Sequence, residues 1–193
     1  MLTNERKQEL RKLAEWVSPA DDHYYFHMTQ KLFDTSMSVH TNPDLHTTQE
    51  YYKAYCLQRE IGFDAFKEEA TSKMAVITCP KELHFLADGH NYDGGMWFLE
   101  QIMMNPACDI ITAKMVYWLC QPDYYYSQYG SPQNCPDSDI NRKTAHFLVR
   151  LEAKANSEGF STGLVLDVPP YDEQPPNLDF TTEPYSRVPD AFR

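Results

Sequence analysis

The chain has 193 residues, of which 42% are hydrophobic and 13% aromatic, so it is long enough to form one domain with a sizeable core. Its formal net charge of −11 disfavours nucleic-acid binding, because an acidic surface repels phosphate, and it favours a basic partner. The N-terminus lacks the apolar stretch of a signal peptide, and no run reaches the length of a membrane span, which predicts a cytoplasmic protein without membrane contact.

Five amphipathic helices are predicted in the first half of the chain. Thr3 is suited to cap the first, and Thr47-Thr48-Gln49-Glu50 fits the capping box that opens the third. Ser18-Pro19 ends the first helix and starts the second, and Gly62 ends the third. These helices are expected at about residues 4–17, 19–37, 47–61, 64–74 and 80–86.

The stretch from His90 to Trp118 predicts a packed helical hairpin. Asn91 and Asp93 are short acceptors placed to bond free backbone N–H groups at the start of its first arm. Asn105 followed by Pro106 is the natural pairing of a cap and a first helical residue for the second arm. That arm is apolar on most sides, which is typical of a buried helix.

After Pro122 the chain is predicted to be irregular, in a loop rich in tyrosine. Asp137 or Ser138 then begins a long amphipathic helix that Gly159 ends. The apolar residues of this helix recur at helical spacing: Ile140, Thr144, Phe147, Leu148, Leu151 and Ala155.

Residues 164–193 hold six of the thirteen prolines, which excludes a regular α-helix there. We expect an acidic, extended tail that either lies on the domain through Leu178, Phe180 and Tyr185 or stays mobile. The predicted fold class is therefore all-α: one compact multi-helix domain over residues 1–163, followed by an extended Pro-rich tail over residues 164–193.

Several motifs in the middle of the chain keep a fixed order: Asn91-Tyr92-Asp93-Gly94-Gly95, Asn105-Pro106-Ala107-Cys108-Asp109, Thr112-Ala113 and Tyr117-Trp118. In this order they resemble the bacterial domain-of-unknown-function family 4274. The chain departs from the family at Tyr92, where Trp is usual, and at Ile111, where Gly is usual. Glu158-Gly159-Phe160 and Leu166-Asp167-Val168-Pro169 fit its closing segment, so the resemblance covers about residues 81–169, with a family-like core at 81–163.

The resemblance implies a small helical protein without an established reaction. Some members are found near secreted bacterial toxins, which suggests immunity proteins that neutralise a toxin by binding it. We therefore expect a non-catalytic binding protein, with no cofactor and no metal, that occludes the active region of a basic secreted toxin domain. A general adaptor with a different partner fits the same sequence.

The expected partner-binding residues lie in the tyrosine loop: Asp123, Tyr124, Tyr125, Tyr126 and Tyr129. Tyrosines in loops are favoured contact residues, because they bring a large area and a polar tip at modest entropy cost. The alternative is that these tyrosines pack the tail onto the core and that the acidic charge serves solubility alone.

A hydrolase-like or metal-dependent enzyme is the alternative function. It would use His90, Asp93 and Cys108, with His84 and Asp109 close by, since a Cys–His pair with a carboxylate is a nucleophilic arrangement. We favour a structural role for the hairpin motif, in which carboxylates cap helices, His90 bonds backbone and Cys108 fills the turn. The residues of this structural motif are His90, Asn91, Asp93, Cys108, Asp109 and Trp118.

Two further patterns are weaker. His23 and His27, beside Asp22, have the i, i+4 spacing of two metal ligands, but the glutamate of a His-Glu-x-x-His motif is missing, which favours ordinary histidines. The five cysteines include no C-x-x-C pair, which disfavours a disulfide framework or a zinc site. Cys56, Cys108 and Cys120 are expected to be reduced core residues.

Overall fold

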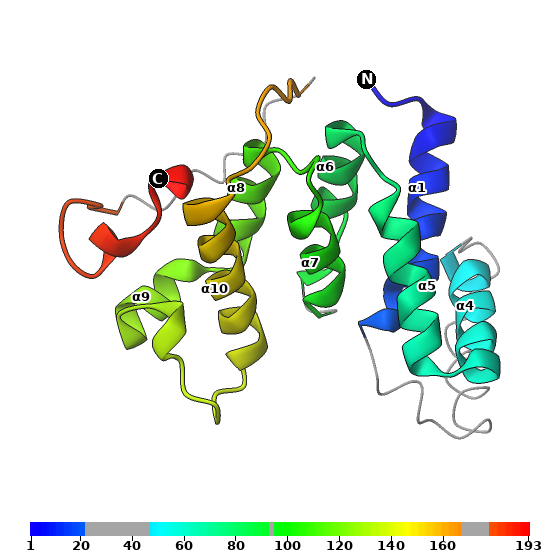
Figure 1. Cartoon of the computed structure of the whole chain (residues 1–193), viewed down its shortest axis with the longest axis horizontal. Helices are drawn as coiled ribbons and strands as arrows, with labels where there is room; N and C mark the ends of the chain where they lie inside the picture. Colours follow the sequence, from blue (N-terminus) through cyan, green and yellow to red (C-terminus); the bar gives the residue numbers. More distant parts are fainter. Residues whose placement is uncertain (22–46, 93–94, 167–177) are drawn as a thin grey trace. The chain divides into compact units, whose positions relative to one another are not determined.

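The computed structural model describes residues 1–21, 47–92, 95–166 and 178–193, and the predicted all-α class is confirmed over these ranges (Figure 1). Eight α-helices follow one another there: α1 (Asn4–Val17), α4 (Thr47–Ile61), α5 (Phe63–Ala75), α6 (Pro80–Asp88), α7 (Trp97–Met104), α8 (Ile110–Leu119), α9 (Pro122–Tyr129) and α10 (Arg142–Ser157). Four short 3₁₀ helices accompany them: η1 (Ser18–Ala20), η3 (Pro132–Asn134), η4 (Tyr185–Arg187) and η5 (Asp190–Phe192).

The chain forms two compact units, each of which draws on two stretches of sequence. The first comprises Met1–Ile77 and Asp93–Gln101, and the second comprises Thr78–Tyr92 and Ile102–Arg193. The division falls within α7. The single domain that the sequence predicts over residues 1–163 stays a prediction.

Helices α1, α4 and α5 pack together with η1 to make the core of the first unit. Its most deeply buried side chains come from all three helices: Leu10, Val17, Tyr55, Phe66, Ala70 and Met74. The Trp16 ring lies 5.0 Å from that of Phe66. Thr3 Oγ1 accepts a hydrogen bond from the Arg6 N–H at 3.2 Å, which confirms the predicted cap of the first helix. Gly62 ends α4 as predicted, with its N–H on the Gln58 carbonyl at 2.9 Å.

Only the first residues of the second predicted helix, over residues 19–37, belong to the described part of the chain. Ser18, Pro19 and Ala20 form η1, directly after α1, as the Ser18-Pro19 pair predicts for the end of the first helix. His23 and His27 lie outside the described residues.

The second unit is built around α8. Thr112, Ala113, Val116, Tyr117 and Trp118 of this helix are all buried, which confirms the prediction of a buried helix. Helix α10 presents Ala145, Phe147, Leu148 and Leu151 to the interior, largely as its helical spacing predicts. The start of α10 is wrong in the prediction, because the helix begins at Arg142 and leaves Ile140 outside it, 94% exposed.

The predicted irregular tyrosine loop is also wrong, because Pro122–Tyr129 forms α9. Pro122 occupies the first helical position, where its missing N–H costs nothing. Gly130 ends the helix at φ 75°, and its N–H donates to the Tyr126 carbonyl at 2.9 Å. Pro122 and Gly130 are helix signals that can be read from the sequence. They were overlooked because the apolar side chains of α9 are not confined to one face of the helix.

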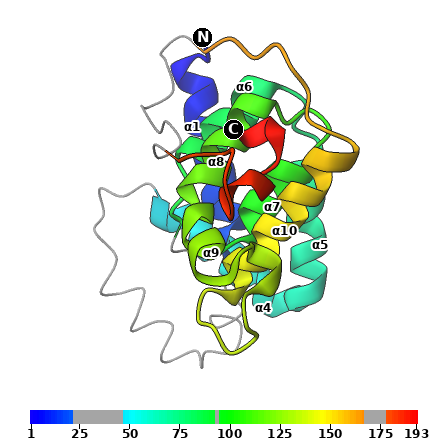
Figure 2. The same cartoon turned by 90° about the vertical axis from the view of Figure 1, so that its left-hand side faces the viewer.

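The C-terminal segment is folded back rather than extended over its described residues, 178–193. Val188 and Phe192 are buried, and η5 packs against α8, as the red segment in Figure 2 shows. The Phe192 ring stacks on Tyr117 with centroids 4.1 Å apart, and the Phe192 carbonyl accepts a hydrogen bond from Trp118 Nε1 at 2.9 Å. The three expected anchors, Leu178, Phe180 and Tyr185, are all half-buried, and Phe180 contacts the Trp118 ring.

Within the described ranges, no helix has both the length and the apolar character that crossing a bilayer would require.

Candidate functional site

The Asn105–Asp109 turn connects α7 to α8. Asn105 Oδ1 accepts from the Ala107 N–H at 2.9 Å, and the Asn105 carbonyl accepts from the Cys108 N–H at 3.0 Å. Asn105 therefore closes a turn rather than capping a helix that starts at Pro106, so the predicted helix start is wrong. The helix starts at Ile110, because the side chain of Asp109 accepts a hydrogen bond from the free N–H of Ile111.

Asp109 uses both carboxylate oxygens to hold backbone. Its Oδ1 accepts from the Ile111 N–H and its Oδ2 from the Leu164 N–H, each at 2.9 Å, and the residue is 1% exposed. One oxygen caps α8 as predicted, and the other secures a segment that lies beyond α10. Such charge-assisted bonds are strong in a buried environment.

Ser161 completes this connection and was not identified from the sequence, which offers no local signal for it. Its carbonyl accepts from the Ile110 N–H at 2.9 Å, and its N–H donates to the Cys108 carbonyl at 3.0 Å. These two backbone hydrogen bonds form an isolated parallel β-bridge between Asp109 and Ser161.

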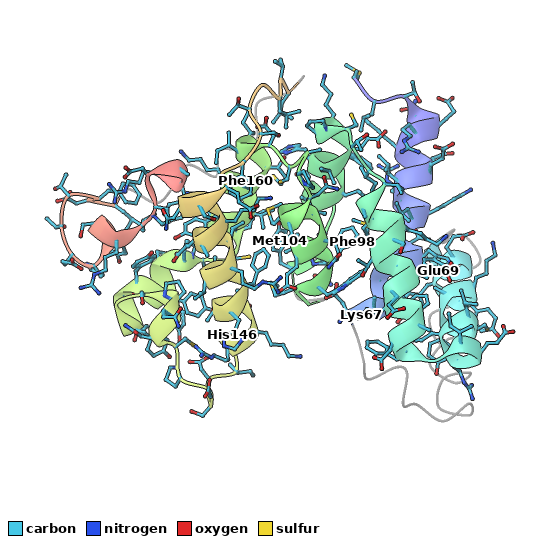
Figure 3. All side chains as sticks on the ribbon, in the orientation of Figure 1. Lys67, Glu69, Phe98, Met104, His146 and Phe160 are labelled. Carbon is cyan, nitrogen blue, oxygen red and sulfur yellow. The ribbon has the colours of Figure 1, made fainter. Side chains whose placement is uncertain are left out.

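Lys154 was also missed by sequence reasoning. Its Nζ donates to the Met103 carbonyl at 2.7 Å and lies 3.4 Å from the Asn105 carbonyl, at the end of α7. The same ammonium group lies 4.9 Å from the centroid of the Phe160 ring, which Figure 3 labels after α10. A cation at the C-terminal end of a helix satisfies free carbonyls, but burial lowers the pKa of Lys154.

Cys108 and His84 are held in structural positions. Cys108 is fully buried, and burial raises the pKa of its thiol to about 12, which removes the thiolate that a nucleophile requires. His84 Nδ1 lies 3.0 Å from Thr112 Oγ1, and burial lowers the pKa of this imidazole against the opposing pull of Asp88 and Asp109. Because Thr112 is 0% exposed, its hydroxyl does not face solvent.

The four other cysteines differ in their exposure. Cys120 and Cys135 are buried, Cys79 is half-buried and Cys56 is exposed. The expectation that Cys56 is a core residue is therefore wrong, because its position on α4 faces away from the buried side that carries Ala54 and Tyr55. Cys120 fits the expectation, since burial raises its pKa to about 12.

The first half of the hairpin motif is only partly described. The rings of His90 and Tyr92 meet edge to face with centroids 5.5 Å apart, and Tyr92 Oη donates to the Ala87 carbonyl at 3.4 Å. Asp93 lies outside the described residues, and Asn91 is exposed. Convergence of Asp93 with His90 and Cys108 stays a prediction.

Comparison with known proteins identifies the segment that contains this turn. The model of a family described as a domain of unknown function (DUF4274) matches residues 78–155. The matched segment is under half of the chain and contains α6, α7, α8, α9 and most of α10. The match confirms the resemblance and ends before the closing motif from Glu158 onward. No curated protein and no solved structure matches the chain.

The start of α7 is held by a residue outside the segment that matches the DUF4274 model. Asp21 Oδ1 accepts from the Trp97 N–H at 2.5 Å, and Oδ2 accepts from the Phe98 N–H at 3.0 Å. Burial raises the pKa of Asp21 to about 6, against the two backbone hydrogen bonds and the positive charge of Lys67. Lys67 also lies over the Trp97 ring, at 5.9 Å from its centroid, and both Lys67 and Phe98 are labelled in Figure 3.

The expected partner-binding tyrosines divide into two groups. Tyr125 and Tyr126 are only 3% and 2% exposed, which favours the alternative that they pack the core and the tail. Tyr124 is 38% exposed, and Tyr129 and Asp123 are half-exposed. A role of Tyr124, Tyr129 and Asp123 in binding stays a prediction.

Glu152 is half-buried and forms a polar centre that the sequence did not reveal. Its Oε1 accepts from Tyr117 Oη at 2.8 Å and lies 3.0 Å from Tyr126 Oη. Burial raises the pKa of Glu152, and the two phenols oppose that shift. Tyr126 Oη is also 3.3 Å from the Arg187 carbonyl, so this centre connects α8, α9 and α10 to the C-terminal segment.

Among the described residues, no group of three or more His, Cys, Asp or Glu side chains could hold a metal ion.

Proposed function

We propose that this protein is a non-catalytic binding module for a basic protein, and that it acts as an immunity protein by covering the active region of a toxin. One observation carries the proposal. Residues 115–141 contain no Lys or Arg, and they include the carboxylates Asp123, Asp137 and Asp139. This range includes the second half of α8, all of α9 and the loop that leads to α10.

The carboxylates in this range differ in their accessibility. The Asp137 side chain is 92% exposed, and Asp123 and Asp139 are half-exposed. A region of one sign of charge steers a partner of opposite sign during the approach and rejects partners of like sign. A basic toxin domain meets this requirement.

The chemistry of the DUF4274 motif supports binding rather than catalysis. Asp109 uses both of its oxygens on backbone N–H groups, and Cys108 is buried with a raised pKa. These side chains support the fold, so the exposed acidic surface is the better candidate for function. The toxin as partner rests on the family resemblance described above.

The proposal is tested with the full chain and the protein encoded by the adjacent gene. We expect the two to form a complex whose Kd rises with ionic strength, because salt screens exposed charges. The paired change Asp123→Asn and Asp137→Asn should weaken the complex by about tenfold. The activity of the neighbouring protein should fall when the complex forms.

The matched control is the paired change Asp88→Asn and Glu158→Gln, which removes the same charge from exposed positions outside residues 115–141. Binding that is equally weakened by both pairs contradicts the assignment to this region. A complex that leaves the neighbour's activity intact indicates an adaptor, and failure to form any complex at low salt overturns the proposal.

A further inference from the structure

We infer that the surface of α8 beneath the C-terminal segment is a peptide-docking surface, and that residues 178–193 are its intramolecular ligand (Figure 2). The partner that this surface fits is a segment of another protein with the same chemistry, a short turn that ends in an aromatic side chain. Such a segment would displace the intramolecular ligand. The residues that form the surface, the aromatic face, are Lys114, Tyr117, Trp118, Tyr126 and Phe160.

The ring of Phe192 makes the main contact with the aromatic face. It stacks on Tyr117 with centroids 4.1 Å apart and an interplanar angle of 16°, and its centroid lies 6.1 Å from that of Phe160. Phe192 is 0% exposed, although it is the second-last residue of the chain. A buried aromatic ring in stacked contact contributes a large apolar area and a defined geometry. The aromatic face is therefore shaped to receive one aromatic side chain.

The aromatic face also binds the main chain of its occupant. Trp118 Nε1 donates to the Phe192 carbonyl at 2.9 Å, and Lys114 Nζ donates to the carbonyl of the next residue. Tyr126 Oη lies 3.3 Å from the Arg187 carbonyl. Every peptide has such carbonyls, so these side chains bind a peptide without selecting its sequence.

The C-terminal segment is connected to the rest of the second unit as a bound peptide is. Within the described part of the chain, no hydrogen bond between backbone groups joins residues 178–193 to other residues. The segment instead closes on itself: the Ser186 N–H donates to the Thr182 carbonyl at 2.8 Å, and Arg193 Nε donates to the Val188 carbonyl at 2.8 Å. It can therefore leave the aromatic face without breaking a backbone ladder, and its internal bonds lower the entropy cost of docking.

The charged side chains of the segment pair with one another. Arg187 forms an ion pair with Glu183 at 2.8 Å, and Arg193 forms one with Asp190 at 2.8 Å. In the described ranges, no ion pair joins the segment to the aromatic face. The aromatic ring and the main-chain carbonyls therefore decide recognition, and the charge of the partner does not.

The family match separates the aromatic face from its occupant. Lys114, Tyr117, Trp118 and Tyr126 lie within the matched residues 78–155, whereas residues 178–193 lie outside them. A ligand tethered by a short linker has an effective concentration of about millimolar, so a free peptide binds well only after the tethered one is weakened. Weakening the segment and then adding it back as a peptide therefore tests the inference.

The experiment uses the full chain with the change Phe192→Ser and a synthetic peptide of residues 178–193. Isothermal titration calorimetry should show that the peptide binds this variant at least about tenfold more tightly than it binds the wild type, whose own segment competes. The peptide should also raise the Tm of the variant towards that of the wild type. The matched control is the same peptide carrying Phe192→Ser, which should bind neither protein.

A second pair of variants tests the aromatic face itself. In the Phe192→Ser background, Trp118→Phe keeps a ring but removes the Nε1 donor, and it should weaken peptide binding by about fivefold. Trp16→Phe is the matched control, because Trp16 lies on α1 in the first unit, and it should leave the Kd unchanged. If Phe192→Ser loses its cooperative unfolding transition, Phe192→Leu replaces it, since leucine keeps most of the apolar volume but cannot stack.

Three results would overturn the inference. A folded variant that does not bind the peptide shows that residues 178–193 are an integral part of the core. An equal Kd for the wild type and the variant shows that the peptide binds at a site that the segment does not occupy. Binding that Trp118→Phe leaves unchanged shows that the aromatic face is not the docking surface.

Discussion

Asp21 and Trp97 are 76 positions apart in the sequence, and the carboxylate of the first caps the helix that the second begins. The Trp97 and Phe98 N–H groups each donate to one oxygen of Asp21. A side chain at a helix N-terminus normally comes from the residue just before the helix. Here a distant segment supplies it, so the start of α7 depends on tertiary structure.

This contact makes stability depend on pH. Burial raises the pKa of Asp21 from 3.8 to about 6, so the folded state binds this proton more tightly than the unfolded state. The stabilisation is fully present below pH 3.8 and is lost as the pH rises through about 6, a change of about 3 kcal/mol. Lys67 and Glu100 act on Asp21 in opposite directions.

The change Asp21→Asn removes the titrating group and keeps one acceptor oxygen. We expect the wild type to lose about 2 kcal/mol more than this variant when urea unfolding is compared between about pH 4 and pH 7. Parallel pH profiles for the two proteins, or a profile with the opposite slope, would contradict the assignment.

Gly95 allows Asp21 to approach. A Cβ at this position would lie 2.8 Å from Asp21 Oδ1, and the φ of 112° is one that other residues rarely adopt. Gly163 has a similar φ of 107° but open space around its Cβ position, so Gly163→Ala reports the cost of the backbone alone. We expect Gly95→Ala to lower the free energy of unfolding by about 1–2 kcal/mol more than Gly163→Ala. In the Asp21→Ala background that difference should shrink, because of the three close contacts only the one with the Cβ of residue 21, at 3.2 Å, remains.

Most helices follow from local patterns. The Thr3 cap, the glycine at position 62 and the apolar face of α10 all act within a few residues, and these predictions are confirmed. Helix α9 was missed because its tyrosines lie on both its buried and its exposed sides, which hides the periodicity. The stacking of Phe192 on Tyr117 was not predicted, because proline content says nothing about a contact between residues so far apart in the sequence.

The same distinction between local and distant contacts applies to the candidate site. Asp109 bonds the N–H two residues later, so its capping role is readable from the Asn-Pro-x-Cys-Asp motif. Its second bond, to Leu164, spans 55 positions, and the bond of Lys154 to the Met103 carbonyl spans 51.

Asp109 should be the most sensitive residue of the DUF4274 motif. Asp109→Ala leaves the Ile111 and Leu164 N–H groups without their acceptors, and we expect a loss of about 2–4 kcal/mol in the free energy of unfolding. Asp88→Ala is the control, since Asp88 is an exposed acid at the end of α6. Hydrogen exchange at the Ile111 and Leu164 amides should accelerate in Asp109→Ala. Unchanged exchange at Leu164 would show that the second oxygen contributes nothing.

The rate at which a thiol reagent modifies each cysteine tests whether Cys108 is structural or nucleophilic. Cys56 is exposed, whereas burial raises the pKa of Cys108 and Cys120 to about 12. An aromatic disulfide reagent at about pH 8 should therefore modify Cys56 quickly in the native protein and reach Cys108 only after unfolding. Peptide mapping after a short exposure identifies the labelled residue, and Cys56→Ser should remove the fast phase. Rapid labelling of native Cys108 would instead support the enzymatic alternative, because only an accessible thiolate reacts at that rate.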